Sequence, residues 1–279
     1  MKKHWSGNGN GRIRTVVLFV LAVLFLFLIT ASGKIFEDEA MVTDFSRKNL
    51  VPCLTYPFGT DWMGRDMFVR TLTGLSMSIR IGLLAASVSA VIALILGLLS
   101  ATLGKAVDSV ITWIIDLVMG IPHILLLILI SYACGKGFRG VVIGVSLTHW
   151  TSLARLIRGE VLQLKEAQYI KVAEKLGMSK LKIAWKHLFP HLFPQFLVGL
   201  ILMFPHAILH EASITFLGFG LSPEQPAIGV ILEESMKYLA MGKWWLALFP
   251  GLFLVLTVVL FDVAGESFRK LMDPGSTHE

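Results

Sequence analysis

The chain has 279 residues, of which 55% are hydrophobic and 16% are charged, and its mean hydropathy is +0.72. Soluble domains carry about 25% charged residues, so this composition excludes an ordinary soluble enzyme. In a membrane protein, the formal net charge of +6 bears on orientation in the bilayer, and we expect no nucleic-acid partner.

Six apolar runs without Asp, Glu, Lys or Arg are candidates for transmembrane helices, because roughly 20 apolar residues cross the ~30 Å hydrocarbon core. The fourth run is shorter and contains His149 and Trp150, which indicates a tilted or partly shielded span. In the third run, Pro122 predicts a kink or a break. We expect the first run to be a retained anchor rather than a cleaved signal peptide. The runs cover residues 15–33, 81–104, 117–135, 140–154, 187–210 and 244–261.

Basic residues gather between positions 155 and 191, which predicts that this loop lies in the cytoplasm. Alternation of the spans then places both termini in the cytoplasm. The chain divides into an N-terminal tail with the first span (1–33), an extracytoplasmic loop (34–78), a five-helix core (79–265) and a C-terminal tail (266–279). A second outer loop contains a possible short helix over 228–239. The basic residues of the cytoplasmic loop are Arg155, Arg158, Lys165, Lys171, Lys175, Lys180, Lys182 and Lys186.

Within the cytoplasmic loop, the sequence predicts a helix over 165–176, a turn and a second short helix. Gly177 is the expected C-terminal cap of the first helix, and Ser179 is the expected N-cap of the second. Pro190 and Pro194 are expected to mark the turn into the fifth span. Such a hairpin fits either an amphipathic element on the lipid surface or a docking element for a soluble partner.

Motifs of catalysis are missing from the sequence. No GxxxxGK[ST] phosphate loop, HExxH zinc motif or GxSxG elbow occurs. We therefore expect no catalytic residue and no cofactor in this chain, and an energy source that lies elsewhere. Cys53 and Cys134 both fall on the outer side and are expected to be unpaired, although a disulfide is possible.

Several segments together resemble the dipeptide, oligopeptide and nickel branch of the ATP-binding-cassette importer permeases. The stretch FGTDWMGRD, residues 58–66, resembles the family's GTDxxGRD signature. The pairs His149-Trp150 and Ala154-Arg155, with Arg158, resemble the entry to the family's cytoplasmic loop, and residues 211–220 resemble its ExxLSFLGLG segment. Gly265, Arg269 and Asp273-Pro274 resemble its terminal motif. The residues of the outer-loop signature are Gly59, Thr60, Asp61, Gly64, Arg65 and Asp66.

This resemblance implies the transmembrane domain of a type I importer, with six helices and a coupling helix pair, in a bacterial cytoplasmic membrane. It also implies a homologous second permease subunit, an extracytoplasmic substrate-binding protein and two cytoplasmic ATPase subunits that bind ATP and Mg²⁺. A stand-alone ion-coupled carrier or channel is the alternative from another class.

The family's coupling motif, EAAxxxG followed by nine residues and IxLP, aligns on Gly177 and Pro190. Ala173 then occupies an alanine of the motif, and Lys171 stands where the family has an acidic residue. Glu174 could supply the charge instead. By resemblance, the residues that couple to the ATPase are Lys171, Ala173, Glu174, Gly177 and Pro190.

Ionisable residues in the fifth span indicate a translocation path, because such groups usually face a cavity or a partner. His206 and His210 lie one helical turn apart, beside Glu211, and two imidazoles at this spacing could contact nickel or zinc. They could equally be hydrogen-bonded packing residues, and His123 is expected to be structural. Nickel-type permeases resemble this sequence at His210 and at His149-Trp150, so nickel or a metal chelate is the expected cargo, closest to the nickel-type second subunit. Di- or oligopeptides are the alternative.

Overall fold

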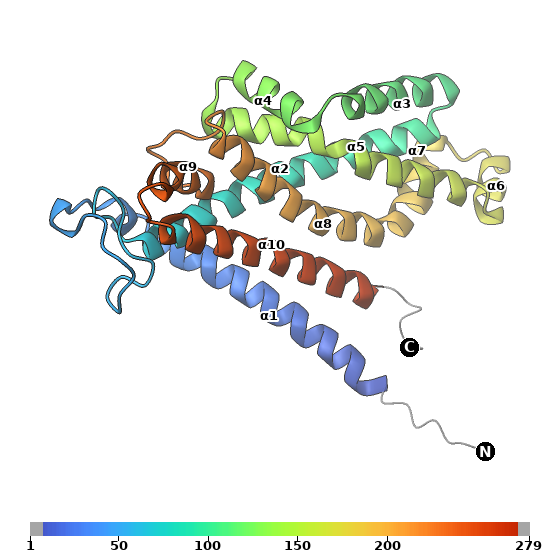
Figure 1. Ribbon diagram of the computed structural model, residues 1–279. Helices are drawn as coiled ribbons and strands as arrows, with labels where there is room; N and C mark the ends of the chain where they lie inside the picture. The colour runs from blue at the N-terminus through green and yellow to red at the C-terminus, as the bar shows by residue number, and fades with distance from the viewer. Residues whose placement is uncertain (1–7, 273–279) are drawn as a thin grey trace. The chain divides into compact units, whose positions relative to one another are not determined.

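The computed structural model describes residues 8–272. All regular structure in this part of the chain is helical, apart from an isolated antiparallel bridge between Thr60 and Asp66 (Figure 1). The outermost parts of both expected tails, 1–7 and 273–279, lie outside the described residues, as do Asp273 and Pro274 of the terminal motif. The prediction of an all-α protein is confirmed.

Among residues 8–272, five helices are long and apolar enough to cross a membrane, and a bent helix pair makes a sixth crossing if it is counted as one span. These numbers agree with the six spans expected. The five long helices are α1 (Asn8–Ile35), α2 (Met67–Thr102), α5 (Gly137–Lys165), α8 (Phe189–Phe216) and α10 (Trp245–Met272). The other helices are α3 (Lys105–Gly120), α4 (His123–Ala133), α6 (Gln168–Lys175), α7 (Lys180–Ile183) and α9 (Ile228–Leu239), with short 3₁₀ turns at Glu39–Met41 and Phe45–Arg47.

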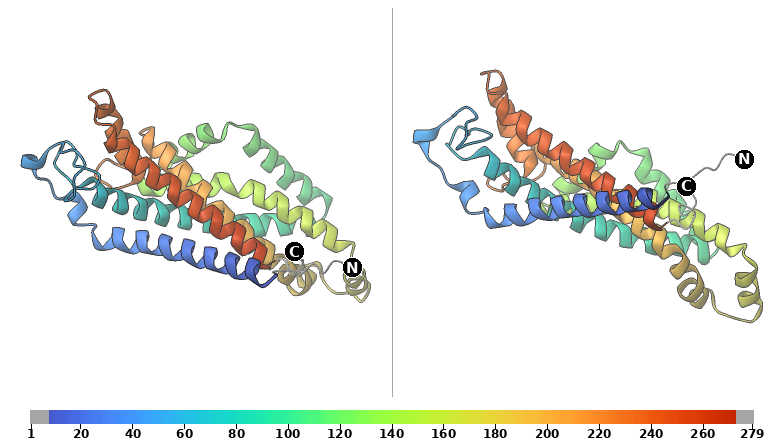
Figure 2. Two further views of the ribbon diagram at one scale, coloured as in Figure 1. Left: turned by 60° about the horizontal axis from the view of Figure 1, so that its bottom comes forward. Right: turned by 90° about the horizontal axis from the view of Figure 1, so that it is seen from below.

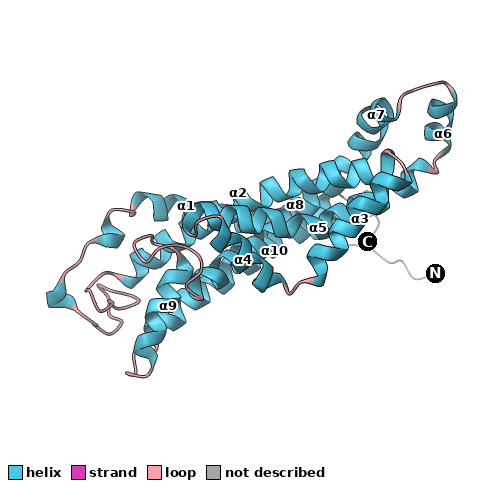
Figure 3. Ribbon diagram, turned by 90° about the horizontal axis from the view of Figure 1, so that it is seen from above, coloured by secondary structure: helices cyan, strands magenta, loops and turns pink. Residues whose placement is uncertain are grey.

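The bent pair consists of α3 and α4, which meet at 99° (Figure 3). The break lies at Ile121 and Pro122, as the proline predicts, because Pro122 cannot donate a backbone hydrogen bond. The helical segment begins at Lys105, well before the apolar run. Its acidic residues are accommodated because Asp108 pairs with Arg158 and Asp116 pairs with Arg155 of α5.

The α6–α7 hairpin, defined here as residues 168–183, follows the predicted order of helix, glycine turn and helix. Gly177 has a φ of +80° just after α6, and the Ser179 hydroxyl accepts a hydrogen bond from the Lys182 amide at 3.4 Å. The turn expected at Pro190 and Pro194 is wrong. The chain stays helical from Lys180 to Phe216, through a π-helical stretch at Ala184–Leu188, and Pro194 lies inside α8. Pro190 is the second residue of α8, which begins directly after the π-helical stretch.

Two compact units make up the chain. The first comprises Met1–Met77 and Pro226–Glu279; in it α1 runs alongside α10, and α9 packs against α10 (Figure 2). The second unit is Ser78–Gln225, in which α5 lies against both α4 and α8. Residues 67–77 of α2 belong to the first unit and 78–102 to the second. In the apolar 18-residue stretch of α5, 61% is buried, compared with 22% in that of α1. This difference confirms the expected shielding of the span that contains His149.

Candidate functional site

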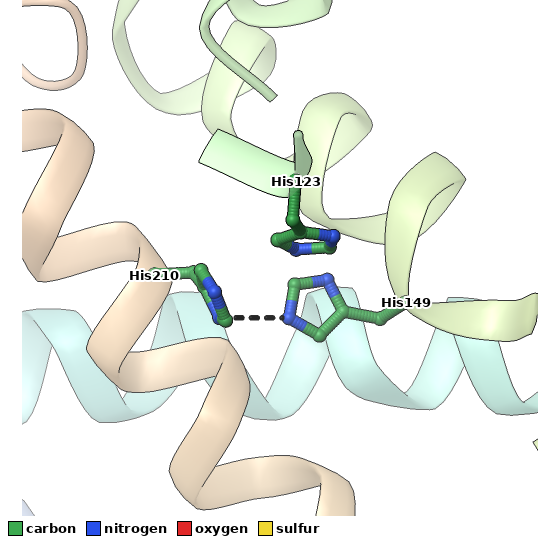
Figure 4. Close-up of side chains that lie close together, drawn as sticks. All are labelled: His123, His149 and His210. Carbon is green, nitrogen blue, oxygen red and sulfur yellow. Dashed lines mark hydrogen bonds between the residues drawn. The ribbon is translucent and has the colours of Figure 1, made fainter. Parts of the chain in front are cut away.

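Three histidines from three different helices meet inside the second unit (Figure 4). His123 is the first residue of α4, directly after the break at Pro122, while His149 lies in α5 and His210 lies in α8. The ring centroids are 4.7 Å apart for His123 and His149, 4.4 Å for His123 and His210, and 4.8 Å for His149 and His210. We call these three residues the histidine cluster.

Backbone carbonyls orient two rings of the histidine cluster. Nδ1 of His149 lies 3.0 Å from the carbonyl oxygen of Val145, and Nδ1 of His210 lies 2.8 Å from that of His206. A carbonyl oxygen only accepts, so both Nδ1 atoms carry the proton, and a neutral imidazole then has a free lone pair on Nε2. Nε2 of His149 accepts a hydrogen bond of 3.1 Å from the Nδ1–H of His210, which this N–H shares with the His206 carbonyl. The buried Nε2 of His123 has no hydrogen-bond partner among the described residues.

A cavity of about 860 Å³ adjoins the histidine cluster. This volume falls in the range of about 300–1,000 Å³ that is typical of small-molecule sites. All of the lining residues belong to the second unit. The polar side chains among them are Thr148, Thr151 and Ser152 together with His123, His149, His206 and His210.

The residues that we expect on the translocation path lie in three different environments. His210 belongs to the histidine cluster, whereas the exposed side chain of His206 lines the cavity outside the cluster. Glu211 is fully buried and accepts a hydrogen bond of 2.9 Å from the Thr215 hydroxyl. The roles of His206, His210 and Glu211 stay predictions. Sequence reasoning missed His123 as a cluster member; the available signal was that three separate apolar runs contain histidine, including His123 in the third run and His149 in the fourth.

The outer-loop signature folds around the carboxylate of Asp61. Its Oδ1 accepts from the amides of Met63 at 2.8 Å and Arg65 at 2.9 Å, and its Oδ2 accepts from the Arg65 guanidinium at 2.6 Å. Thr60 donates its hydroxyl hydrogen to the Arg47 carbonyl. Gly64 has a φ of +77°, and a Cβ there would collide with the backbone of Asp44, so this position requires glycine.

Two residues outside the signature complete this ion-pair network. Arg70 of α2 donates to Oδ2 of Asp61 at 2.6 Å and to Oε2 of Glu234 in α9 at 3.0 Å, and Arg65 reaches the same Glu234 oxygen at 3.1 Å. The network therefore ties the signature to α9, which forms at the expected residues 228–239. Sequence reasoning missed Arg70 and Glu234, because nothing local to either residue indicates its partner.

Asp66, the last residue of the signature, caps the start of α2. Its Oδ1 accepts from the amides of Phe68 at 2.8 Å and Val69 at 3.5 Å, which are unpaired donors of the first helical turn. Partial burial raises the pKa of the Asp66 carboxyl, and the two amide hydrogen bonds oppose this shift.

The α6–α7 hairpin combines a buried face with an exposed apolar face. Ile170 and Ala173 are buried, whereas Leu176 is 81% exposed. Lys171 donates to Glu166 at 2.7 Å, which lowers the pKa of the Glu166 carboxyl. Of the residues expected to couple to an ATPase, Lys171, Ala173 and Glu174 lie on α6, Gly177 follows it, and Pro190 lies at the start of α8; their role stays a prediction. The other exposed apolar residues of the hairpin are Tyr169, Val172 and Leu181, and the exposed Trp185 follows directly after it.

Comparison with known proteins gives one family and a consistent set of relatives. Residues 93–277 match the family described as binding-protein-dependent transport system inner membrane component. The dipeptide transport system permease protein DppC of Bacillus subtilis (strain 168) is 31% identical, over 97% of this chain and 84% of that protein. The oligopeptide transport system permease protein OppC of the same strain is 32% identical, over 94% and 87%. The probable D,D-dipeptide transport system permease protein DdpC of Escherichia coli (strain K12) is 30% identical, over 95% and 89%.

Among solved structures, an inward-facing conformation of the MetNI methionine ABC transporter resembles this chain with a TM-score of 0.62. The match covers 74% of this chain and 98% of that chain at 17% identity. At this identity the likeness shows the fold alone, and the fold is the transmembrane domain of a type I importer, as expected.

Proposed function

This chain belongs to the inner membrane components of binding-protein-dependent transport systems, as a permease subunit of an ATP-binding-cassette importer, and we propose that it carries di- or oligopeptides inward across the cytoplasmic membrane. The observation that carries this proposal is the similarity to DppC and OppC over 97% and 94% of the chain. A similarity of this extent includes the outer-loop signature, the α6–α7 hairpin and the long helices together.

The peptide cargo takes the place of the nickel or metal-chelate cargo that His206 and His210 led us to expect. The relatives described above are named for peptides, and nothing in the comparisons supports nickel transport. The cavity of about 860 Å³ is large enough for a small peptide-like ligand, and its mixed polar and apolar lining suits a ligand that must pass without being held tightly.

Energy for transport is proposed to come from two cytoplasmic ATPase subunits that bind ATP and Mg²⁺. The partner on the outer side is a substrate-binding protein, and a homologous second permease completes the pathway. The α6–α7 hairpin is proposed to dock on an ATPase, because its Leu176 and Leu181 are 81% and 61% exposed and Trp185, directly after it, is 64% exposed. Exposed apolar side chains beside lysines fit a protein contact at the cytoplasmic surface. Movement of the ATPase pair would then shift α5 and α8 through the hairpin.

Uptake measurements in the native host test the cargo. Deletion of the gene should abolish uptake of a radiolabelled dipeptide or tetrapeptide, and expression of the chain in trans should restore it. Uptake of ⁶³Ni²⁺, measured in parallel, should be unchanged. Normal peptide uptake with loss of ⁶³Ni²⁺ uptake would reject the peptide proposal in favour of a metal importer.

A second measurement tests the dependence on partner subunits. The purified chain reconstituted alone in liposomes should not transport peptide, whereas the complete complex with ATP and the binding protein should. Transport by the chain alone would identify it as a stand-alone carrier or channel.

A further inference from the structure

We propose that His123, His149 and His210 form a binding site for one divalent first-row transition-metal ion, such as Ni²⁺ or Zn²⁺, with a coordination position open to the cavity. The site concerns metal binding by this subunit and does not depend on which cargo the importer carries.

The ring nitrogens of the three histidines are close enough together to bind one ion. One ring nitrogen from each histidine lies within 4.8 Å of the other two. Tetrahedral coordination at about 2.1 Å places ligand nitrogens about 3.4 Å apart, so the ring nitrogens must move only slightly closer than their present limit of 4.8 Å. Small side-chain rotations are therefore enough to bring three nitrogens around one ion.

Backbone carbonyls hold two of the rings in the tautomer that binds metal. Metal-binding histidines commonly donate the other ring N–H to a backbone carbonyl, which fixes the tautomer and the ring orientation. The carbonyls of Val145 and His206 accept in this way from His149 and His210. Both histidines therefore hold Nε2 as a lone-pair donor.

His123 offers a ring nitrogen that lacks a hydrogen-bond partner. Its Nε2 is buried without a hydrogen-bond partner among the described residues, and leaving a buried polar atom unpaired is costly. His123 is placed beside the other two rings by the break at Pro122, which starts α4 at this residue. Ligation would satisfy this nitrogen and replace the single hydrogen bond between His149 and His210.

The donor set and the cavity define the class of ion. Imidazole nitrogens favour zinc, copper and nickel, whereas calcium and magnesium require oxygen ligands. Three protein ligands beside a cavity leave a further position for water or for a ligand in the cavity, as in open zinc sites. The site is therefore suited to an exchangeable ion.

Equilibrium dialysis of the assembled importer, purified without a histidine tag, with NiCl₂ or ZnCl₂ tests the proposal. We expect one ion per copy of this subunit, in the presence of excess Mg²⁺. Each of His123→Gln, His149→Gln and His210→Gln should weaken binding at least about tenfold. His191→Gln, which changes an exposed histidine outside the cluster, is the matched control and should bind as wild type. Equal binding by wild type and the triple variant would overturn the proposal.

X-ray absorption of the zinc-loaded wild-type complex gives an answer that does not depend on the folding of variants. We expect three imidazole ligands with Zn–N distances of about 2.0–2.1 Å. A shell of oxygen ligands alone would overturn the proposal. Peptide uptake, measured separately, reports on the cargo, so failure of the metal site and failure of the peptide proposal are distinguishable.

Discussion

The Arg70 guanidinium donates a hydrogen bond of 3.0 Å to Oε2 of Glu234, although the two residues are 164 positions apart in the chain. Their side chains are 2% and 16% exposed. The same guanidinium pairs with Asp61, so this buried arginine joins the outer-loop signature to α9, beside the direct contact of Arg65 with Glu234. Charges removed from water are stable only when they are paired in this way.

Removing one charge from this network should therefore be strongly destabilising. We expect Arg70→Gln to lower the free energy of unfolding by about 3–5 kcal/mol, because Asp61 and Glu234 keep two buried negative charges and only Arg65 remains to pair with them. Thermal unfolding in detergent, followed by intrinsic fluorescence, measures the change.

Lys237→Gln is the matched control on α9. Lys237 pairs with Glu233 at 2.8 Å, but its side chain is 65% exposed, and exposed helical pairs contribute about 0.5 kcal/mol or less. A loss for Arg70→Gln no larger than that for Lys237→Gln would contradict the assigned role of the network.

Features that depend on residues close together in the sequence were predictable, and features that depend on distant segments were not. The α6–α7 hairpin and the break before α4 rest on residues a few positions apart, such as Gly177, Ser179 and Pro122, so the sequence was enough. The turn predicted at Pro194 is wrong, because a proline inside an apolar spanning helix can be accommodated by neighbouring helices and by small adjustments of the backbone.

The candidate site was less predictable, because it depends on packing between distant segments. His210 was identified as a candidate, and the structure places its ring beside the rings of His123 and His149, whereas His206 contacts it through its backbone carbonyl. A pattern within one helix shows residues one turn apart, whereas the bend between α3 and α4 decides where His123 lies. The contacts of Arg70 with Asp61 and Glu234 have the same origin.

Gly177 provides a prediction about the hairpin. Its φ of +80° is unfavourable for a residue with a Cβ, so Gly177→Ala should cost about 1–2 kcal/mol in the local fold. We expect less ATPase subunit to co-purify with the variant and less ATPase stimulation by the binding protein.

Gly159→Ala is the control for that substitution. Gly159 lies inside α5, and a Cβ there would meet open space, so alanine should be neutral or slightly stabilising. If both variants assembled with the ATPase as wild type does, the turn at Gly177 would not be needed for docking.

Asp66 gives a prediction about pH. Burial raises the pKa of its carboxyl above the ordinary value of about 3.9, so the folded state favours the protonated form more than the unfolded chain does. The contribution of this group to stability is thus greatest below pH 3.9 and is lost as pH rises through the raised pKa.

Asp66→Asn isolates this contribution, since an asparagine oxygen can still cap α2. The melting temperature of Asp66→Asn minus that of wild type should therefore be higher at pH 7 than at pH 4. A difference that is constant between these pH values would show that the carboxyl does not titrate as proposed.

The pairing of α3 with α5 gives the last prediction. Arg158 makes two hydrogen bonds to Asp108, Nε to Oδ1 at 2.5 Å and Nη2 to Oδ2 at 2.7 Å. Lysine cannot reproduce this two-point geometry, so Arg158→Lys should lower the unfolding free energy by about 1 kcal/mol. Arg155 makes one bond to Asp116, with the two side chains 50% and 61% exposed, so Arg155→Lys should change stability by less than about 0.5 kcal/mol. Thermal unfolding of both variants in the same detergent measures the difference, and equal shifts would show that the two-point contact adds no stability over a single exposed pair.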